Sequence, residues 1–169
     1  MESGHNAGAE FAEVAERYCG LLDRHQASGG PELVRALYVL LPELLFRASA
    51  LPRGDASEES ELSDPLGDDG WRAIFESLTD TLGELDLYWE VFDPTALGDD
   101  DPMTATLSDD LADIYRDLRR GLGLPGSPLP SRAVWDWRFD FESHWGHHAI
   151  DALRTMHALM YSHGLGDDA

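Results

Sequence analysis

The sequence predicts an all-α protein, a single-domain up-and-down bundle of about five or six helices. Three observations carry this prediction. Apolar residues recur at spacings of three and four along most of the chain, which is the period of a helix that buries one face. No segment shows strict alternation of apolar and polar residues, so no strand is expected. The length of 169 residues and the apolar content of 43% suit one domain with a hydrophobic core, spanning residues 1–169.

The first two helices are expected over residues 9–26 and from Pro31 onward. The Ser-Gly-Gly stretch at 28–30 ends the first helix. Proline is well tolerated in a first turn, which makes Pro31 a suitable start for the second. The second helix carries a wide apolar stripe and is expected to be central. Pro42 lies inside it and should kink or split it.

Residues 52–69 are rich in Asp, Glu and Ser and are expected to form a flexible acidic loop. A third helix follows, with apolar positions in register from Trp71 to Leu82. The same spacing continues through Tyr88 and Trp89, which predicts a further helical segment whose aromatic side chains close the core.

The fourth helix is expected to open at Ser108, because serine is a favoured N-cap residue. The Gly- and Pro-rich residues 121–130 form a connector. One long helix from Ser131 to Ser162 follows, and residues 164–169 are expected to be a disordered acidic tail.

The chain carries 33 acidic residues against 12 lysines and arginines, a formal net charge of −21. A surface of this sign repels nucleic acids and anionic membranes, so direct nucleic-acid binding is not expected. It can attract a basic protein partner, and an acidic mimic of nucleic acid also stays open. Much of the acid lies in loop or tail segments, which argues against mimicry.

Cysteine usage and hydropathy indicate the compartment. Cys19 is the only cysteine, so no internal disulfide can form, which suits a reducing cytoplasm. The longest apolar stretch, residues 33–51, is interrupted by charged residues and a proline and is interpreted as a core helix rather than a membrane span. The start of the chain lacks the features of a signal peptide. We therefore expect a cytoplasmic protein with no membrane partner.

Nucleophilic catalysis finds no support in the sequence. Cys19 lies on an apolar helix with no activating pattern around it. No glycine-rich phosphate loop and no serine in a nucleophile elbow are present. We therefore assign no catalytic residue and no organic cofactor, and the sequence leaves open whether the protein is an enzyme.

The chemically richest stretch is DFESHWGHHAID at residues 140–151. On one helix, His144, His148 and Asp151 form a polar line at spacings of four and three, which is also a spacing that metals use on helices. Two histidines and a carboxylate suit a divalent transition metal such as zinc or ferrous iron. A second helix would have to supply further ligands, and three aspartates of the fourth helix are the candidates: Asp110, Asp113 and Asp117.

Two other interpretations of the same residues stay open. The stretch departs from the HExxH motif, because Trp145 stands where the motif has glutamate. Histidines between helices commonly hydrogen-bond a carboxylate and bind nothing else, so a structural polar network is the favoured interpretation. A functional pocket without metal is the third.

Three segments together resemble the bacterial family DUF5063, a domain of unknown function. They are YWEVFDP, LSDDLADIYRDLRRGL and VWDWRFDFESHWGHHAIDALRTMHAL, and the likeness extends over most of the chain. The resemblance implies a small helical protein in a bacterial cytosol. It implies no catalytic residue, because the family is one of unassigned activity.

The expected function is therefore a non-catalytic interaction or accessory role, through a protein partner or self-association. The expected last helix is apolar on a second face, around Phe139, Ile150 and Leu153, which favours a partner. The alternative is a metal-binding or metal-dependent protein that uses the His/Asp cluster, and the weaker alternative is the acidic mimic.

Overall fold

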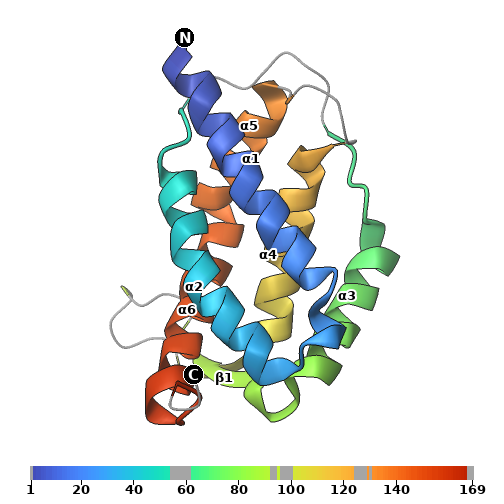
Figure 1. Cartoon of the computed structure of the whole chain (residues 1–169), viewed down its shortest axis with the longest axis vertical. Helices are drawn as coiled ribbons and strands as arrows, with labels where there is room; N and C mark the ends of the chain where they lie inside the picture. The colour runs from blue at the N-terminus through green and yellow to red at the C-terminus, as the bar shows by residue number, and fades with distance from the viewer. Residues whose placement is uncertain are drawn as a thin grey trace.

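The structure is a computed structural model that describes residues 2–53, 62–91, 95, 101–123, 129 and 131–166. These residues form six α-helices and one two-stranded sheet, which confirms the all-α class. The helices pack side by side as a bundle, with the short sheet at one end (Figure 1). Their bounds are α1 (Glu2–Leu22), α2 (Gly30–Ser49), α3 (Gly67–Leu82), α4 (Leu107–Leu122), α5 (Ser131–Ser143) and α6 (Trp145–Ser162).

Helix α4 is the centre of the bundle, because it packs against α1, α3, α5 and α6. Its apolar stripe is buried from Leu107 to Leu118, and the Tyr18 hydroxyl of α1 donates to the Leu111 carbonyl over 3.0 Å. At its end, Trp137 of α5 packs directly on Gly121, where a Cβ atom would lie 2.2 Å from the indole ring. This close packing holds α5 against α4. Within the described residues, no helix combines the length and the apolar character needed to cross a membrane.

The expectation that the chain has no strand was wrong. Strands β1 (Leu87–Glu90) and β2 (Met103–Thr106) pair antiparallel, with Tyr88 opposite Ala105. Gly83 ends α3 with a φ of 54°, a left-handed conformation that favours glycine, and a short 3-10 turn (Gly83–Leu85) follows. The helical spacing that continues past Leu82 is therefore coincidental.

The aromatic side chains of β1 divide between the two faces of the sheet. Tyr88 points inward against the core, whereas Trp89 is 70% exposed. Because side chains alternate along a strand, only one of the two can face the bundle. The expectation that both residues close the core was therefore wrong for Trp89.

Three expected helix boundaries need correction. The first helix spans Glu2–Leu22 rather than 9–26, and a 3-10 turn occupies His25–Ala27. The cap of α4 is Thr106 rather than Ser108, because the Thr106 hydroxyl accepts from the Asp109 amide over 3.2 Å. Helix α2 is not split at Pro42, since the buried leucines on either side of the proline pack into the core.

The expected single helix over 131–162 is two helices. The chain leaves helical geometry at His144, which has φ −145° and ψ −90°. At Gly146, a Cβ atom would lie 2.1 Å from the carbonyl oxygen of Phe141, so only glycine fits this approach of α6 to the end of α5. The break therefore belongs to the packing of the two helices on each other, which the sequence period does not reveal.

The acidic segments lie largely outside the described residues. Of the expected loop at 52–69, residues 54–61 are not described, and residues 67–69 already belong to α3. Of the expected tail, residues 167–169 are not described. Just before them, Arg35 donates to the Leu165 carbonyl over 2.9 Å, and the Gly166 amide donates to Met160.

Candidate metal centre

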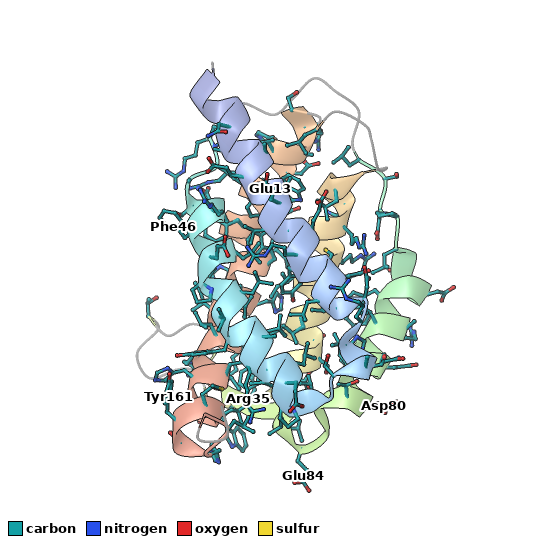
Figure 2. All side chains as sticks on the ribbon, viewed as in Figure 1. Glu13, Arg35, Phe46, Asp80, Glu84 and Tyr161 are labelled. Atoms are coloured by element: carbon teal, nitrogen blue, oxygen red, sulfur yellow. The ribbon has the colours of Figure 1, made fainter. Side chains whose placement is uncertain are left out.

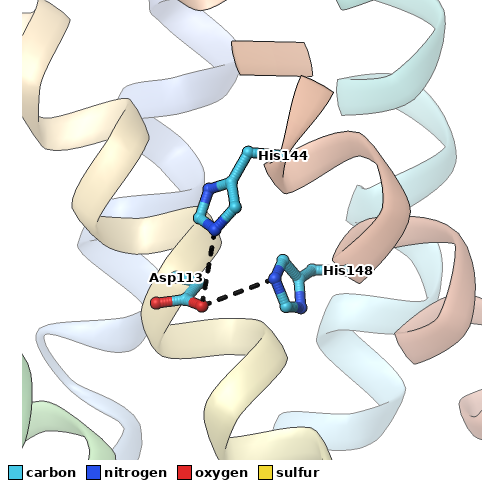
Figure 3. A group of neighbouring side chains, drawn as sticks. All are labelled: Asp113, His144 and His148. Carbon is cyan, nitrogen blue, oxygen red and sulfur yellow. Dashed lines mark ion pairs between the residues drawn. The ribbon is translucent and has the colours of Figure 1, made fainter. Parts of the chain in front are cut away.

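The carboxylates of α4 face the histidines at the start of α6. Asp110, Asp113 and Asp117 lie three and four residues apart, so one side of α4 presents all three. Helices α4 and α6 pack against each other, which brings His144 and His148 opposite this carboxylate row. Figure 3 shows both imidazoles directed from the α5–α6 break toward Asp113.

Each histidine uses its Nδ1 atom to bond a separate, buried carboxylate. His144 Nδ1 lies 2.7 Å from Asp117 Oδ2, and His148 Nδ1 lies 2.8 Å from Asp110 Oδ1. Asp110 and Asp117 are both buried. The second oxygen of Asp110 accepts from the Tyr88 hydroxyl over 2.7 Å. These bonds fix the plane of each ring, and because a carboxylate only accepts, each Nδ1 donates its proton. In the neutral ring, Nε2 then carries the lone pair.

Both Nε2 atoms converge on the third carboxylate. Asp113 Oδ2 lies 3.4 Å from His148 Nε2 and 3.8 Å from His144 Nε2. The Trp71 indole of α3 donates to the other oxygen of Asp113 over 2.7 Å, which holds the carboxylate in place. One ligand atom from each of Asp113, His144 and His148 lies within 4.8 Å of the other two. The arrangement is a three-point cluster with a shared centre.

The cluster opens to solvent on the side of His144. The His144 side chain is 49% exposed, against 25% for His148 and 20% for Asp113. An ion from solution could therefore reach the Nε2 atoms without any movement of the core.

Proximity to the carboxylates shifts the pKa of both histidines upward. The hydrogen bond to Asp117 raises the pKa of His144 and outweighs partial burial. Burial acts to lower the pKa of His148, but the hydrogen bond to Asp110 and the charges of Asp110 and Asp113 together raise it. Burial raises the pKa of Asp110 itself to about 6. Without a metal, both imidazoles therefore keep their second proton to a higher pH than an ordinary histidine does, and a cation that binds Nε2 displaces that proton.

The residue types and spacings fit a transition-metal ion. Zinc binds histidine nitrogen and carboxylate oxygen at about 2.0–2.2 Å, so tetrahedral ligand atoms lie about 3.3–3.6 Å apart. The observed separations of 3.4 and 3.8 Å from Asp113 to the two histidines are close to that value. The carboxylates behind each histidine supply the outer hydrogen bonds that metal-binding imidazoles commonly have.

The structure brings together most of the residues singled out in the sequence, but Asp113 takes the place expected for Asp151. His144 and His148 meet, Asp113 lies between their Nε2 atoms, and Asp110 and Asp117 lie behind the rings. Asp151 is not part of the group and instead pairs with Arg154 at 3.6 Å.

The sequence did not predict the contribution of two residues to the site. Trp71 and Tyr88 come from α3 and β1, and each donates one hydrogen bond to a carboxylate of α4. The sequence predicts that both aromatic residues lie in the core, and no local pattern indicates that their side chains donate hydrogen bonds to carboxylates. A hydrophobic residue with one polar tip is a general hint, because a buried indole N–H or phenol O–H requires a partner.

The comparisons with known proteins agree with the fold. The crystal structure of protein BF1032 from Bacteroides fragilis superposes with a TM-score of 0.75 at 23% sequence identity, over 91% of this chain and 92% of that one. At this identity the likeness shows the fold alone. No curated protein matches the chain. The profile of the domain of unknown function DUF5063 matches residues 4–162, so the resemblance noted in the sequence is confirmed and the chain belongs to that family.

Proposed function

We propose that the protein binds one divalent transition-metal ion through Asp113, His144 and His148. The observation that carries this proposal is that the two nitrogens of each imidazole ring have different contacts. Nδ1 is bonded to a buried carboxylate, while Nε2 points at the oxygen shared with the other ring. Two rings oriented in this way toward one carboxylate oxygen define a position for a cation.

A histidine elsewhere in the molecule shows the alternative. Buried His25 places one nitrogen against the Leu22 carbonyl and the other 2.9 Å from the Ser77 hydroxyl, so its two ring nitrogens have neutral partners. His144 and His148 differ, because among the described residues their Nε2 atoms face a carboxylate without a hydrogen bond to it. A purely structural network would be expected to resemble that of His25.

The donor set selects the kind of metal. Two imidazoles and one carboxylate favour zinc or ferrous iron over magnesium or calcium, which prefer oxygen ligands. Three protein ligands leave coordination positions for water or a substrate, as in catalytic rather than structural zinc sites.

The test is metal binding by protein without an affinity tag, stripped with EDTA and titrated with Zn²⁺ and Co²⁺. We expect one equivalent to bind, seen by calorimetry and by the Co²⁺ absorption spectrum. His148→Ala and Asp113→Asn should each weaken binding by about a hundredfold or more, since each removes one of three ligands.

Two neighbouring residues supply matched controls. His147→Ala removes an exposed imidazole next to the site, and Asp151→Asn removes the carboxylate favoured by the sequence spacing. Both variants should bind metal as the unmodified protein does. Equal loss in His147→Ala and His148→Ala, or no binding to the unmodified protein at micromolar concentrations, would overturn the proposal.

A second candidate function is association with a protein partner or a second copy of the chain. It is favoured by a groove between α2 and α6 with a volume of about 500 Å³, lined by Tyr38, Val39, Pro42, Ile150, Leu153, Arg154 and His157. Val39 is 75% exposed and Ile150 56% exposed. Nearby, Phe46 and Tyr161 also project outward, as Figure 2 shows. Exposed apolar residues grouped in this way are typical of an interaction surface.

Sedimentation of the protein at increasing concentration tests self-association, and capture from lysate tests a partner. We expect a complex that survives moderate salt and is lost on Ile150→Glu. A chain that stays monomeric and captures nothing dependent on Ile150 would remove this second function.

A further inference from the structure

A second cavity, of about 520 Å³, lies between α4 and α5. Three arginines line it: Arg116 and Arg120 of α4 and Arg132 of α5. The whole chain holds only 12 lysines and arginines against 33 acids. A quarter of its basic residues therefore meet at one hollow, which a random distribution over an acidic surface does not explain.

The three arginines are not equally engaged. Arg116 bonds Asp64 over 2.8 Å, and Arg132 bonds Asp136 over 2.7 Å. Arg120 instead has two carboxylates at longer range, Asp117 at 3.7 Å and Asp140 at 3.6 Å. It forms no hydrogen bond with the described residues, and its guanidinium keeps donors for another oxyanion.

The α5 wall of the cavity is aromatic. Trp135 and Phe139 stack with ring centroids 5.1 Å apart and planes inclined by 10°. Phe139 is 53% exposed, and Arg132 lies 5.2 Å over the Trp135 ring. Phe139 stacks on Trp135 and Arg132 lies over the same indole, so the exposed Phe139 ring is the aromatic surface that α5 offers to the cavity. It lies beside the arginines and aspartates of the lining. The volume is within the range of small-molecule sites.

We propose that this cavity binds a small planar organic anion, with its carboxylate or phosphate group on Arg120 and its ring against Phe139. A guanidinium binds either headgroup through two parallel hydrogen bonds. Asp64 and Asp136, two of the three carboxylates in the lining, are hydrogen-bonded to their own arginines. The third, Asp140, lies 3.6 Å from Arg120 without a hydrogen bond to it, so the anion would replace a long-range ion pair there.

This cavity is separate from the proposed metal centre. None of its lining residues is one of the three metal ligands. The two sites approach each other at Asp117, which contacts His144 on one side and lies 3.7 Å from Arg120 on the other. They also approach at Asp140, a lining residue whose backbone carbonyl accepts from the His144 amide. Anion binding is therefore expected in metal-free protein, and its failure would leave the metal proposal intact.

The experiment is an NMR titration of the full chain, labelled with ¹⁵N and treated with EDTA. The probes are benzoate, phenyl phosphate, inorganic phosphate and benzyl alcohol, and Trp135→Phe assigns the Trp135 indole signal. We expect one or both aromatic anions to shift that signal and to bind about tenfold more tightly than inorganic phosphate, with no binding of the neutral alcohol. The ratio of benzoate to phenyl phosphate affinity identifies the preferred headgroup.

Variants locate the contacts. Arg120→Gln should weaken the aromatic anions by about tenfold, while Arg154→Gln, on α6, should leave their affinity unchanged. Phe139→Ala changes an exposed ring and leaves Arg120 in place, so it should weaken the aromatic anions but not inorganic phosphate. The proposal is overturned if neither aromatic anion shifts the Trp135 signal, or if Arg120→Gln, folded as judged by the Trp137 and Trp145 indole signals, binds as tightly as Arg154→Gln. Should Arg120→Gln fail to fold, unchanged binding by Phe139→Ala overturns it equally.

Discussion

Two polar clusters lie along α4, and the central aspartate of each makes different kinds of contact. At the start of the helix, Asp86 accepts from the Ser108 amide over 2.7 Å and from the Ser108 hydroxyl over 2.9 Å. Both residues are buried. Further along, Asp113 has a neutral donor on one oxygen only, the Trp71 indole, and turns its other oxygen to two histidines.

The different contacts indicate a structural role for the Asp86 cluster and a binding role for the Asp113 cluster. The Asp86 cluster joins the hairpin side of the molecule to α4 with neutral donors, and both carboxylate oxygens are used. The Asp113 cluster is partly exposed, and its two imidazoles can each exchange a proton for a cation. Changes at the first cluster should act on the stability of the fold, and changes at the second should act on binding.

The pH dependence of metal affinity should give the largest effect. The hydrogen bonds and charges that raise the pKa of His144 and His148 keep both rings protonated below their folded pKa. Metal binding then releases two protons, so affinity should rise by about a hundredfold per pH unit in that range and level off above it. Calorimetry in buffers of different ionisation enthalpy counts the protons. Zinc bound without proton release in that range would show that the histidines are not its ligands.

Removal of the Asp86 carboxylate should be the largest change in stability. Asp86→Ala leaves the buried Ser108 amide and hydroxyl without their acceptor and should lower the free energy of unfolding by about 2–3 kcal/mol. Asp113→Asn, which keeps an oxygen for the Trp71 indole, should cost metal-free protein less than about 1 kcal/mol. Urea denaturation in EDTA measures both. Equal losses would mean that the two clusters are equally structural.

The stability of metal-free protein should fall as the pH rises above the ordinary histidine pKa. A raised folded pKa means that the ion pairs of His144 and His148 contribute fully below about pH 6.5, the unfolded value. That contribution is lost as the pH increases through the raised folded pKa. Thermal unfolding against pH should show this slope, and saturating Zn²⁺ should reverse it. The slope should persist in His147→Ala and shrink in His148→Ala.

The cap of α4 should give the smallest effect. Thr106→Ala removes the hydroxyl that accepts from the Asp109 amide, and N-cap losses of this kind cost about 1 kcal/mol. Thr104→Ala, on the exposed side of β2, is the control and should cost less. Because the cap lies beside the Asp86 cluster and away from the metal ligands, Zn²⁺ affinity should not change. A weakened affinity would show that the two clusters are coupled.

Helical periodicity accounts for most of the fold that could be predicted. The stripes of α1, α2, α3 and α4 appear in the sequence because each helix buries one face, and the three- and four-residue spacing is local. The short hairpin was not predicted, because four residues per strand show too little alternation of apolar and polar side chains to outweigh the helical pattern beside them. The break at His144 was not predicted, because it accompanies the close approach of Gly146 to the Phe141 carbonyl, and no local sequence pattern encodes that approach.

The sequence by itself determined that histidines and aspartates would lie on apolar-striped helices, and which residues those were. It pointed to His144, His148 and Asp151, because spacing along a helix is a local property. It also offered three aspartates of α4 as further ligands: Asp110, Asp113 and Asp117. Only the tertiary structure decided that Asp113, rather than Asp151, shares their centre and that Trp71 and Tyr88 hold its surroundings. The physical reason is that ligand atoms meet across helices, and those distances depend on how α3, α4, α6 and the hairpin pack together.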